Sequence, residues 1–201
     1  MADSEQGGDG TRPRLIVGIS GASGAIYGLR MLERLRDLPV ESHLVISQAG
    51  GLTLKEETGR TVAEVEALAD VVHRNGNIGA SIASGSFRTL GMVVAPCSMK
   101  TLAEIAGGVT QSLISRAADV VLKERRRLVL MARETPLHEG HLENMLRVTR
   151  MGAIVAPPVP AFYARPDSIE RMVDQSVGRV LDLFDLDAAG VSRWSGLNRR
   201  D

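Results

Sequence analysis

The stretch GISGASGAIYG, residues 18–28, most constrains the fold because it joins an apolar run directly to a helical pattern. Residues 15–17 and Ile19 are typical of a buried strand, and apolar residues after the turn recur at helical spacing as far as Leu35. A strand that turns through small residues into a helix points backbone N–H groups and the positive end of the helix dipole at one place. We therefore expect a phosphate site here, with Ser23 as the helix N-cap or as a hydroxyl donor to the anion.

The spacing of the glycines in this turn narrows the class of ligand. It is G-x-x-G-x-x-G, whereas dinucleotide folds use G-x-G-x-x-G, and no lysine follows as in nucleoside-triphosphate loops. The surroundings of Ser23, GASGA, also differ from the G-x-S-x-G elbow of hydrolases. A mononucleotide or another phosphate ester is the favoured occupant, and a close-packed turn without a ligand is the alternative.

Apolar runs and helical patterns alternate along the rest of the chain. Strands are expected over residues 14–19, 43–46, 92–95, 127–133 and 153–155. Helices are expected over residues 24–36, 48–57, 62–68, 101–124 with a break near Gly107, 138–152, and in a last segment that ends near Leu183. The small and polar residues 75–87 indicate a long functional loop. This alternation predicts a single-domain α/β fold with a doubly wound, mostly parallel sheet of the Rossmann or flavodoxin-like type and helices on both faces.

Composition disfavours several classes of partner. The 24 Lys and Arg residues balance the 24 Asp and Glu residues, and aromatic residues make up only 3%, which argues against nucleic-acid binding. No apolar run approaches the length of a membrane span, and the single cysteine fits the reducing cytoplasm. We expect a disordered lead over residues 1–12, a folded domain over 13–185 and a C-terminal tail over 186–201 that packs on a neighbouring subunit.

Polar residues follow the predicted strands where ligands bind in doubly wound sheets, at the carboxyl ends. Ser47 follows the second strand, PCSMKT (residues 96–101) the third, and Arg133 with Glu134 the fourth. The hydroxyls of residues 98–101 would donate to a phosphate, or they only cap the next helix. Arg133 and Glu134 would face the crevice, where a carboxylate beside a phosphate acts as a proton acceptor.

Other chemically reactive side chains have simpler interpretations. Arg116 and Lys123 are seven residues apart and share a helical face, so they either converge on one anion or form a solvated surface. Cys97 lacks a placed base and is interpreted as a small buried residue. His138 and His141 do not form the H-E-x-x-H pattern, so no metal site is predicted.

Together these motifs closely resemble the flavin prenyltransferase family, the UbiX family of ubiquinone biosynthesis, in its bacterial branch. The matching stretches are GISGASGAIYG, HLVIS, SIASGSF, GMVVAPCSMKTL, RAADVVLKERR, LVLMARETPLH and PPVPAFYARP. They run in order over nearly all of residues 14–184. The resemblance implies an enzyme that transfers a dimethylallyl group from dimethylallyl monophosphate to N5 and C6 of reduced FMN, without a metal. It also implies a dodecamer with sites at subunit junctions, and a product, prenylated FMN, that serves UbiD-type decarboxylases.

The resemblance also assigns roles to individual positions. The residues implied in flavin binding are Gly21, Ala22, Ser23, Ser47, Ser98, Met99, Lys100, Thr101 and Arg133. Those implied in holding the allylic phosphate or covering it are Tyr163, Arg179, Arg116, Lys123 and Trp194. Arg116 and Lys123 would be supplied by a neighbouring subunit. Glu134 would accept the C6 proton, Ser23 would assist proton movement, Lys123 would support departure of the phosphate, and Glu57 matches an acidic position near the flavin.

Three other functions remain as alternatives at this point. A flavin-dependent decarboxylase of cysteinyl substrates would share the fold, although the expected histidine after the first turn is absent. An aromatic-acid decarboxylase, as this family was formerly described, would release CO₂ from a hydroxybenzoate without a partner. A non-enzymatic protein for FMN storage or delivery would bind FMN and tolerate loss of Glu134.

Overall fold

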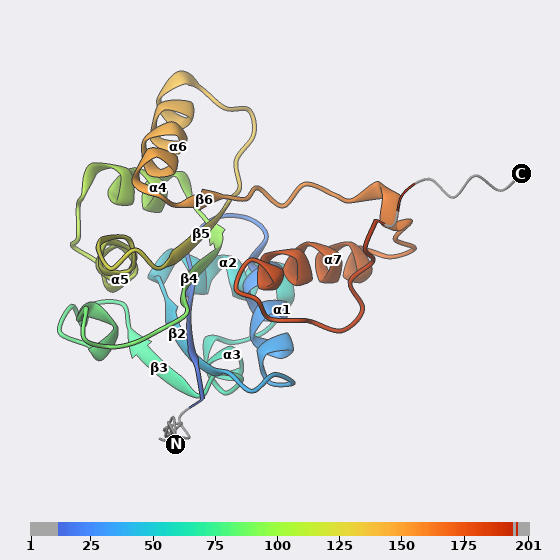
Figure 1. The fold of residues 1–201 in the computed structure, drawn as a ribbon, viewed down its shortest axis with the longest axis horizontal. Coiled ribbons are helices and arrows are strands. Elements are labelled where there is room, and N and C mark those ends of the chain that lie inside the picture. Colours follow the sequence, from blue (N-terminus) through green and yellow to red (C-terminus); the bar gives the residue numbers. More distant parts are fainter. Residues whose placement is uncertain (1–11, 195, 197–201) are drawn as a thin grey trace, which may run out of the picture.

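A six-stranded parallel sheet forms the centre of the molecule in the computed structural model, which describes residues 12–194 and 196 (Figure 1). Its strands are β1 (Arg14–Ile19), β2 (Glu41–Ile46), β3 (Val71–Arg74), β4 (Gly91–Cys97), β5 (Arg127–Ala132) and β6 (Ile154–Val155). Their order is β3-β2-β1-β4-β5-β6, and each neighbouring pair is parallel. The order reverses between β1 and β4, so the predicted doubly wound α/β fold is confirmed.

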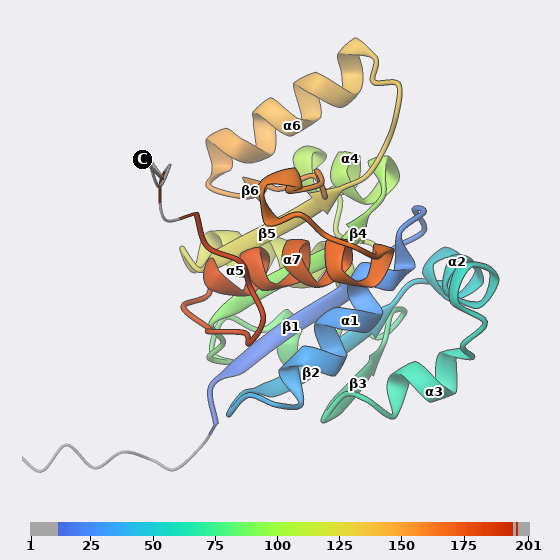
Figure 2. The same cartoon turned by 90° about the vertical axis from the view of Figure 1, so that its right-hand side faces the viewer.

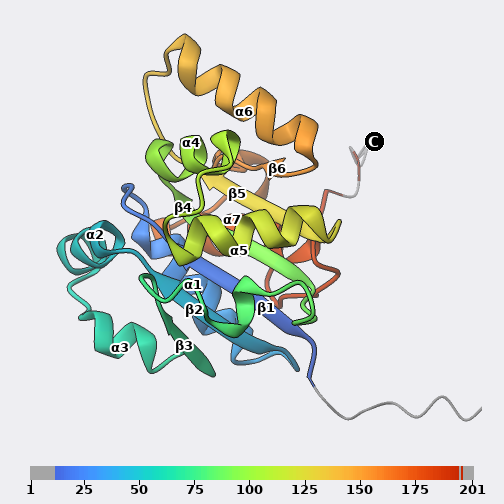
Figure 3. The same ribbon diagram turned by 90° about the vertical axis from the view of Figure 1, so that its left-hand side faces the viewer.

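Helices cover both faces of this sheet. On one face lie α1 (Ala25–Leu35) and α7 (Ile169–Asp182), which pack against each other (Figure 2). On the other lie α4 (Met99–Gly107), α5 (Leu113–Lys123) and α6 (Glu139–Met151) (Figure 3). The remaining helices are α2 (Gln48–Thr58), α3 (Val62–Glu66) and the short 3-10 turns η1 (Ser81–Ala83) and η2 (Phe162–Ala164). Within the described residues, no helix has the length and apolar character needed to cross a bilayer.

Two hydrophobic cores, one on each face, follow from the alternation of side chains along the strands. In β1, Leu15, Val17 and Ile19 enter the core beneath α1 and α7, whereas Ile16 enters the core beneath α5. At the centre of the sheet α1 approaches β4 very closely. A Cβ on Gly28 would lie 2.3 Å from the carbonyl oxygen of Ala95, so only glycine permits this packing.

Three local features differ from the sequence-based expectation. β3 was not predicted, because this four-residue edge strand has only half-buried and exposed side chains. The helical N-cap after the first turn is Gly24, whose φ of 98° favours glycine, so the N-cap role expected for Ser23 is wrong. The third predicted strand continues through Pro96 to Cys97. The lead expected over residues 1–12 lies outside the described residues except for Arg12.

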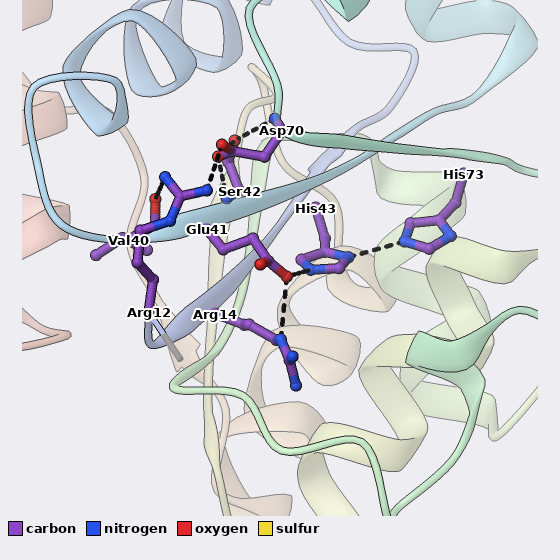
Figure 4. Close-up of polar contacts among 8 residues, drawn as sticks. All are labelled: Arg12, Arg14, Val40, Glu41, Ser42, His43, Asp70 and His73. Atoms are coloured by element: carbon purple, nitrogen blue, oxygen red, sulfur yellow. Dashed lines mark hydrogen bonds and ion pairs between the residues drawn. The ribbon is translucent and has the colours of Figure 1, made fainter. Parts of the chain in front are cut away.

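A polar network ties together β1, β2 and β3 (Figure 4). One oxygen of Glu41 accepts hydrogen bonds from Arg14 Nε at 3.0 Å and from His43 Nε2 at 2.8 Å. The other ring nitrogen of the buried His43 is 2.9 Å from His73 Nε2. Burial, together with His43, lowers the pKa of His73. A second set of hydrogen bonds beside it joins Arg12, Ser42 and Asp70. These bonds fix the edge strand that the apolar pattern does not specify.

Candidate functional site

A cavity of about 460 Å³ opens at the carboxyl ends of β1, β2, β4 and β5. The sequence-predicted residues that line it are Gly21, Ser47, Ser98, Met99, Lys100, Thr101 and Glu134. Residues from four separate strand ends therefore meet in one place, as the strand-end argument predicted. A Cβ on Gly21 would lie 2.4 Å from Ala49 Cβ, so the wall of the cavity requires glycine at this position.

The start of α1, where the sequence predicted a phosphate, holds a carboxylate of the chain itself. Glu57 of α2 accepts hydrogen bonds from the N–H groups of Gly24 at 2.8 Å and Ala25 at 2.9 Å. Partial desolvation disfavours the charge on Glu57, but hydrogen bonds from the Ser23 hydroxyl and these two N–H groups outweigh it and lower its pKa. Glu57 therefore occupies the N–H groups of Gly24 and Ala25, so a bound phosphate would use other N–H donors.

Two other helices present unpaired N–H groups to the cavity. Ser47 caps α2 by accepting the Gly50 N–H at 2.9 Å, and Ser98 caps α4 by accepting the Thr101 N–H at 3.2 Å. The first two N–H groups of each helix, those of residues 48, 49, 99 and 100, have no acceptor within the described part of the chain. Because both dipoles point their positive ends into the same space, the cavity suits an anion such as a phosphate.

The N-terminus of α5 lines the same cavity but is already satisfied. Asn75 accepts the Leu113 N–H with its carbonyl oxygen at 2.8 Å and the Ile114 N–H with its side chain at 3.2 Å. Sequence reasoning treated Asn75 only as part of a long loop. Asn75 follows β3 directly and therefore stands at the carboxyl end of a strand. Because β3 was not predicted, this position could not be assigned to the site.

A buried serine aligns the turn after β1 with the turn after β4. Ser20 donates its hydroxyl to the Pro96 carbonyl at 2.9 Å and accepts the Ser98 N–H at 2.8 Å. This second residue was also missed, because a serine within a glycine-rich turn carries no distinct pattern. It sets the position of Ser98 and hence the direction of α4.

Arg133 and Glu134 follow β5 and are both exposed. The Arg133 N–H donates to the Cys97 carbonyl at 3.2 Å, and Glu134 accepts its neighbour's Thr135 N–H at 2.9 Å. The charge of Arg133 is also among the causes that lower the pKa of Glu57. Glu134 lines the cavity, as the strand-end argument predicted, and Arg133 directly precedes it but is not among the lining residues.

A second group of predicted residues gathers around α7. The Tyr163 and Trp194 rings meet edge to face with centroids 6.0 Å apart. Gln175 donates to the Tyr163 hydroxyl at 3.3 Å. One turn further along α7, Arg179 is the charged residue that lines an otherwise largely apolar cavity of about 240 Å³ beside the proline-rich segment, residues 156–161. The carboxylate of Asp182 accepts hydrogen bonds from Arg179 and Arg193.

Arg116 and Lys123 do not join this second group within one chain. Both lie on α5, on the face of the sheet opposite to α7. Arg116 pairs with Asp119 at 2.8 Å, and Lys123 pairs with Glu124. Neither contributes to the lining of the two cavities described above. The predicted convergence of these cations with Arg179 is therefore not formed by a single subunit.

The remaining reactive side chains are structural. Cys97 is fully buried, and burial raises its pKa to about 12, so the thiol does not ionise near neutral pH. The rings of His138 and His141 stack with centroids 3.6 Å apart. Among residues 12–194 and 196, no three His, Cys, Asp or Glu side chains are grouped as a metal site would require.

Comparisons with known proteins give a consistent result. The family model "Flavoprotein" matches residues 3–181. The Escherichia coli K12 protein named flavin prenyltransferase UbiX is 58% identical over 186 residues, covering 91% of this chain and 98% of its own. The crystal structure of AnUbiX (PadA1) with FMN and dimethylallyl pyrophosphate has a TM-score of 0.91 and 57% identity, covering 93% of this chain and all of that one. A dodecameric FMN-dependent UbiX-like decarboxylase from Escherichia coli O157:H7 has a TM-score of 0.89 and 51% identity, covering 91% and 100%.

Proposed function

The chain belongs to the UbiX family of flavin prenyltransferases, and we propose that it transfers the dimethylallyl group of dimethylallyl monophosphate to N5 and C6 of reduced FMN. Phosphate leaves, and prenylated FMN is the product. The observation that carries this proposal is the cavity in which the unpaired N-termini of α2 and α4 face Glu134, because it combines a phosphate cradle with a proton acceptor.

The cradle fits the phosphate of FMN. The N–H groups of residues 48, 49, 99 and 100 and the hydroxyls of Ser47, Ser98 and Thr101 would hold it. Arg133, which directly precedes Glu134, would supply a further positive charge. The small residues Gly21 and Ala22 leave room beside them. When bound in its reduced form, FMN supplies the electron-rich N5 and C6 positions that accept the prenyl group.

Two carboxylates of the chain have different tasks in this proposal. Glu134 is exposed at the cavity rim and accepts the proton released from C6. Glu57 stays ionised because the N–H groups of α1 and the Ser23 hydroxyl hydrogen-bond to it. The hydroxyl of Ser23 lies beside this carboxylate and assists movement of the proton.

Departure of the phosphate requires concentrated positive charge, since a monophosphate is a poor leaving group. Arg179 and the hydroxyl of Tyr163 would hold it, and Trp194 would cover them. The largely apolar wall beside Arg179 excludes water that would capture an allylic cation. Arg116 and Lys123 lie across the sheet from Arg179, which supports their coming from a neighbouring subunit. We propose a dodecamer like that of the Escherichia coli O157:H7 structure.

The biological setting follows from the product. Prenylated FMN would serve a UbiD-type decarboxylase in ubiquinone biosynthesis or in the decarboxylation of aromatic acids. The cytoplasm suits this role, because Cys97 is buried as a free thiol and needs no oxidising compartment. Residues 13–185 would form the flavin-binding domain. The tail begins at residue 186, and its part up to Trp194 lies against α7 of the same chain.

The test is mass spectrometry of the flavin after anaerobic incubation of the protein with reduced FMN and dimethylallyl monophosphate. We expect a flavin heavier by one C5 unit and stoichiometric release of phosphate. A parallel incubation with the diphosphate donor defines which ester is used. If FMN binds but its mass is unchanged in both incubations, prenyltransferase activity is excluded. A role in FMN storage or delivery would then remain. Release of CO₂ from a hydroxybenzoate without any partner would instead indicate a decarboxylase.

A further inference from the structure

Gln175, on α7, is one of the few polar side chains buried in the described part of the chain, with 4% of its surface exposed. Its Oε1 accepts the Ser192 N–H at 2.8 Å, and its Nε2 donates to the Ser192 carbonyl at 2.8 Å. The same Nε2 donates to the Tyr163 hydroxyl at 3.3 Å. One amide therefore joins α7 to two segments that are distant in sequence: the η2 turn and the C-terminal tail.

Two further contacts hold residues 188–194, the tail strap, along α7. Gly178 accommodates Val191 so closely that a Cβ there would lie 2.1 Å from Val191 Cγ2. Arg193 forms two hydrogen bonds of 2.9 Å with the carboxylate of Asp182. The strap ends with Trp194 against the Tyr163 ring. Both segments that carry the aromatic pair are thus held by contacts with α7.

The direction of the Gln175 amide is determined by its partners. Because the Ser192 N–H can only donate, it must face the oxygen of the amide, and the amide nitrogen must then face Tyr163. An N–H donor that occupies one lone pair of the Tyr163 oxygen leaves the phenolic proton free to point elsewhere. A tyrosine oriented in this way is a hydrogen-bond donor for an anion.

We propose that Gln175 is a positioning residue for the allylic phosphate: it directs the Tyr163 hydroxyl toward the anion and holds Trp194 over it. This inference rests on the proposed function, in which Tyr163 binds that phosphate. Gln175 is not among the residues implied in binding the phosphate, but its amide positions both Tyr163 and Trp194.

The decisive variant is Gln175→Glu, which has nearly the same shape but cannot donate as a carboxylate. It still accepts the Ser192 N–H, but it draws the Tyr163 proton toward itself and away from the phosphate. We expect the KM for dimethylallyl monophosphate to rise about three- to tenfold, as for loss of one hydrogen bond, with the Kd for FMN unchanged. In a Tyr163→Phe background the same change should raise KM less than it does in the unaltered protein, because only its effect on Trp194 remains.

The position of the tail strap can be followed by tryptophan fluorescence, independently of enzyme kinetics, because Trp194 is the single tryptophan of the chain. Gln175→Glu and Gly178→Ala should both shift its emission, the second by displacing Val191 without touching the amide. Gly178→Ala also favours the helix, so it keeps the test valid if Gln175→Glu folds poorly.

Unchanged emission in both variants would overturn the proposal, as would a rise in KM from Gln175→Glu that is equally large with and without the Tyr163 hydroxyl. Absence of prenylated FMN with the unaltered protein would refute the proposed function instead, while the fluorescence shifts would still report whether Gln175 holds the strap.

Discussion

Replacing Glu57 with glutamine tests whether a carboxylate of the chain occupies the first helix N-terminus. The substitution keeps an oxygen that can accept the N–H groups of Gly24 and Ala25, so it removes the charge and little else. A charge at an exposed helix N-terminus contributes about 0.3–1 kcal/mol, and charge-assisted hydrogen bonds are stronger than neutral ones. Because Glu57 is exposed to solvent, we expect a loss of about 1 kcal/mol in the free energy of unfolding.

The dependence on pH identifies the cause. The folded state lowers the pKa of Glu57, so its contribution to stability is complete above the unfolded-state pKa of about 4.3. That contribution is lost as the pH falls through the lower pKa of the folded state. The difference between the unaltered protein and Glu57→Gln should therefore be constant near neutral pH and disappear in acid.

Urea denaturation at matched protein concentration measures this difference, since assembly also affects apparent stability. Glu56→Gln is the matched control, because the adjacent α2 carboxylate makes no side-chain hydrogen bond or ion pair within residues 12–194. The reasoning is refuted if Glu57→Gln is as stable as the control at pH 7. It is equally refuted if the Kd for FMN rises more than about tenfold, because the proposed phosphate cradle lies at α2 and α4.

Three further results are expected. Glu134→Gln should retain FMN binding, followed by fluorescence quenching, and lose formation of the C5-extended flavin, whereas Glu139→Gln on the adjacent helix should keep both. Ser98→Ala should lower the free energy of unfolding by about 1 kcal/mol through loss of the α4 cap and also weaken FMN binding, measured by titration. Arg179→Ala and Lys123→Ala should each abolish turnover, but co-assembled at equal amounts they should recover about a quarter of the sites if neighbours share residues. No recovery in mixed oligomers would place both cations in one subunit.

The sequence alone determined which segments form the central strands and which residues stand at their ends. Long apolar runs such as residues 92–95 are buried whatever surrounds them, and parallel pairing then brings their carboxyl ends together. For that reason the sequence predicts that Ser47, Ser98 and Glu134 lie close together, and the structure places all three in one cavity. The family resemblance rests partly on the same strand-end segments and partly on other stretches, such as residues 81–87 and 116–126.

Tertiary structure decided which of several equivalent donors and acceptors pair. A helix N-terminus attracts any nearby anion, and only the packing of α2 beside α1 selects Glu57, 33 residues away from Gly24. Asn75 and Gln175 likewise act through partners distant in sequence, and their identities carry no periodic signal. Burial of apolar side chains can be predicted from the local sequence, because it depends mainly on the apolar surface of each residue. Hydrogen-bond pairing depends on distance and direction between segments, so it exists only once the chain has folded.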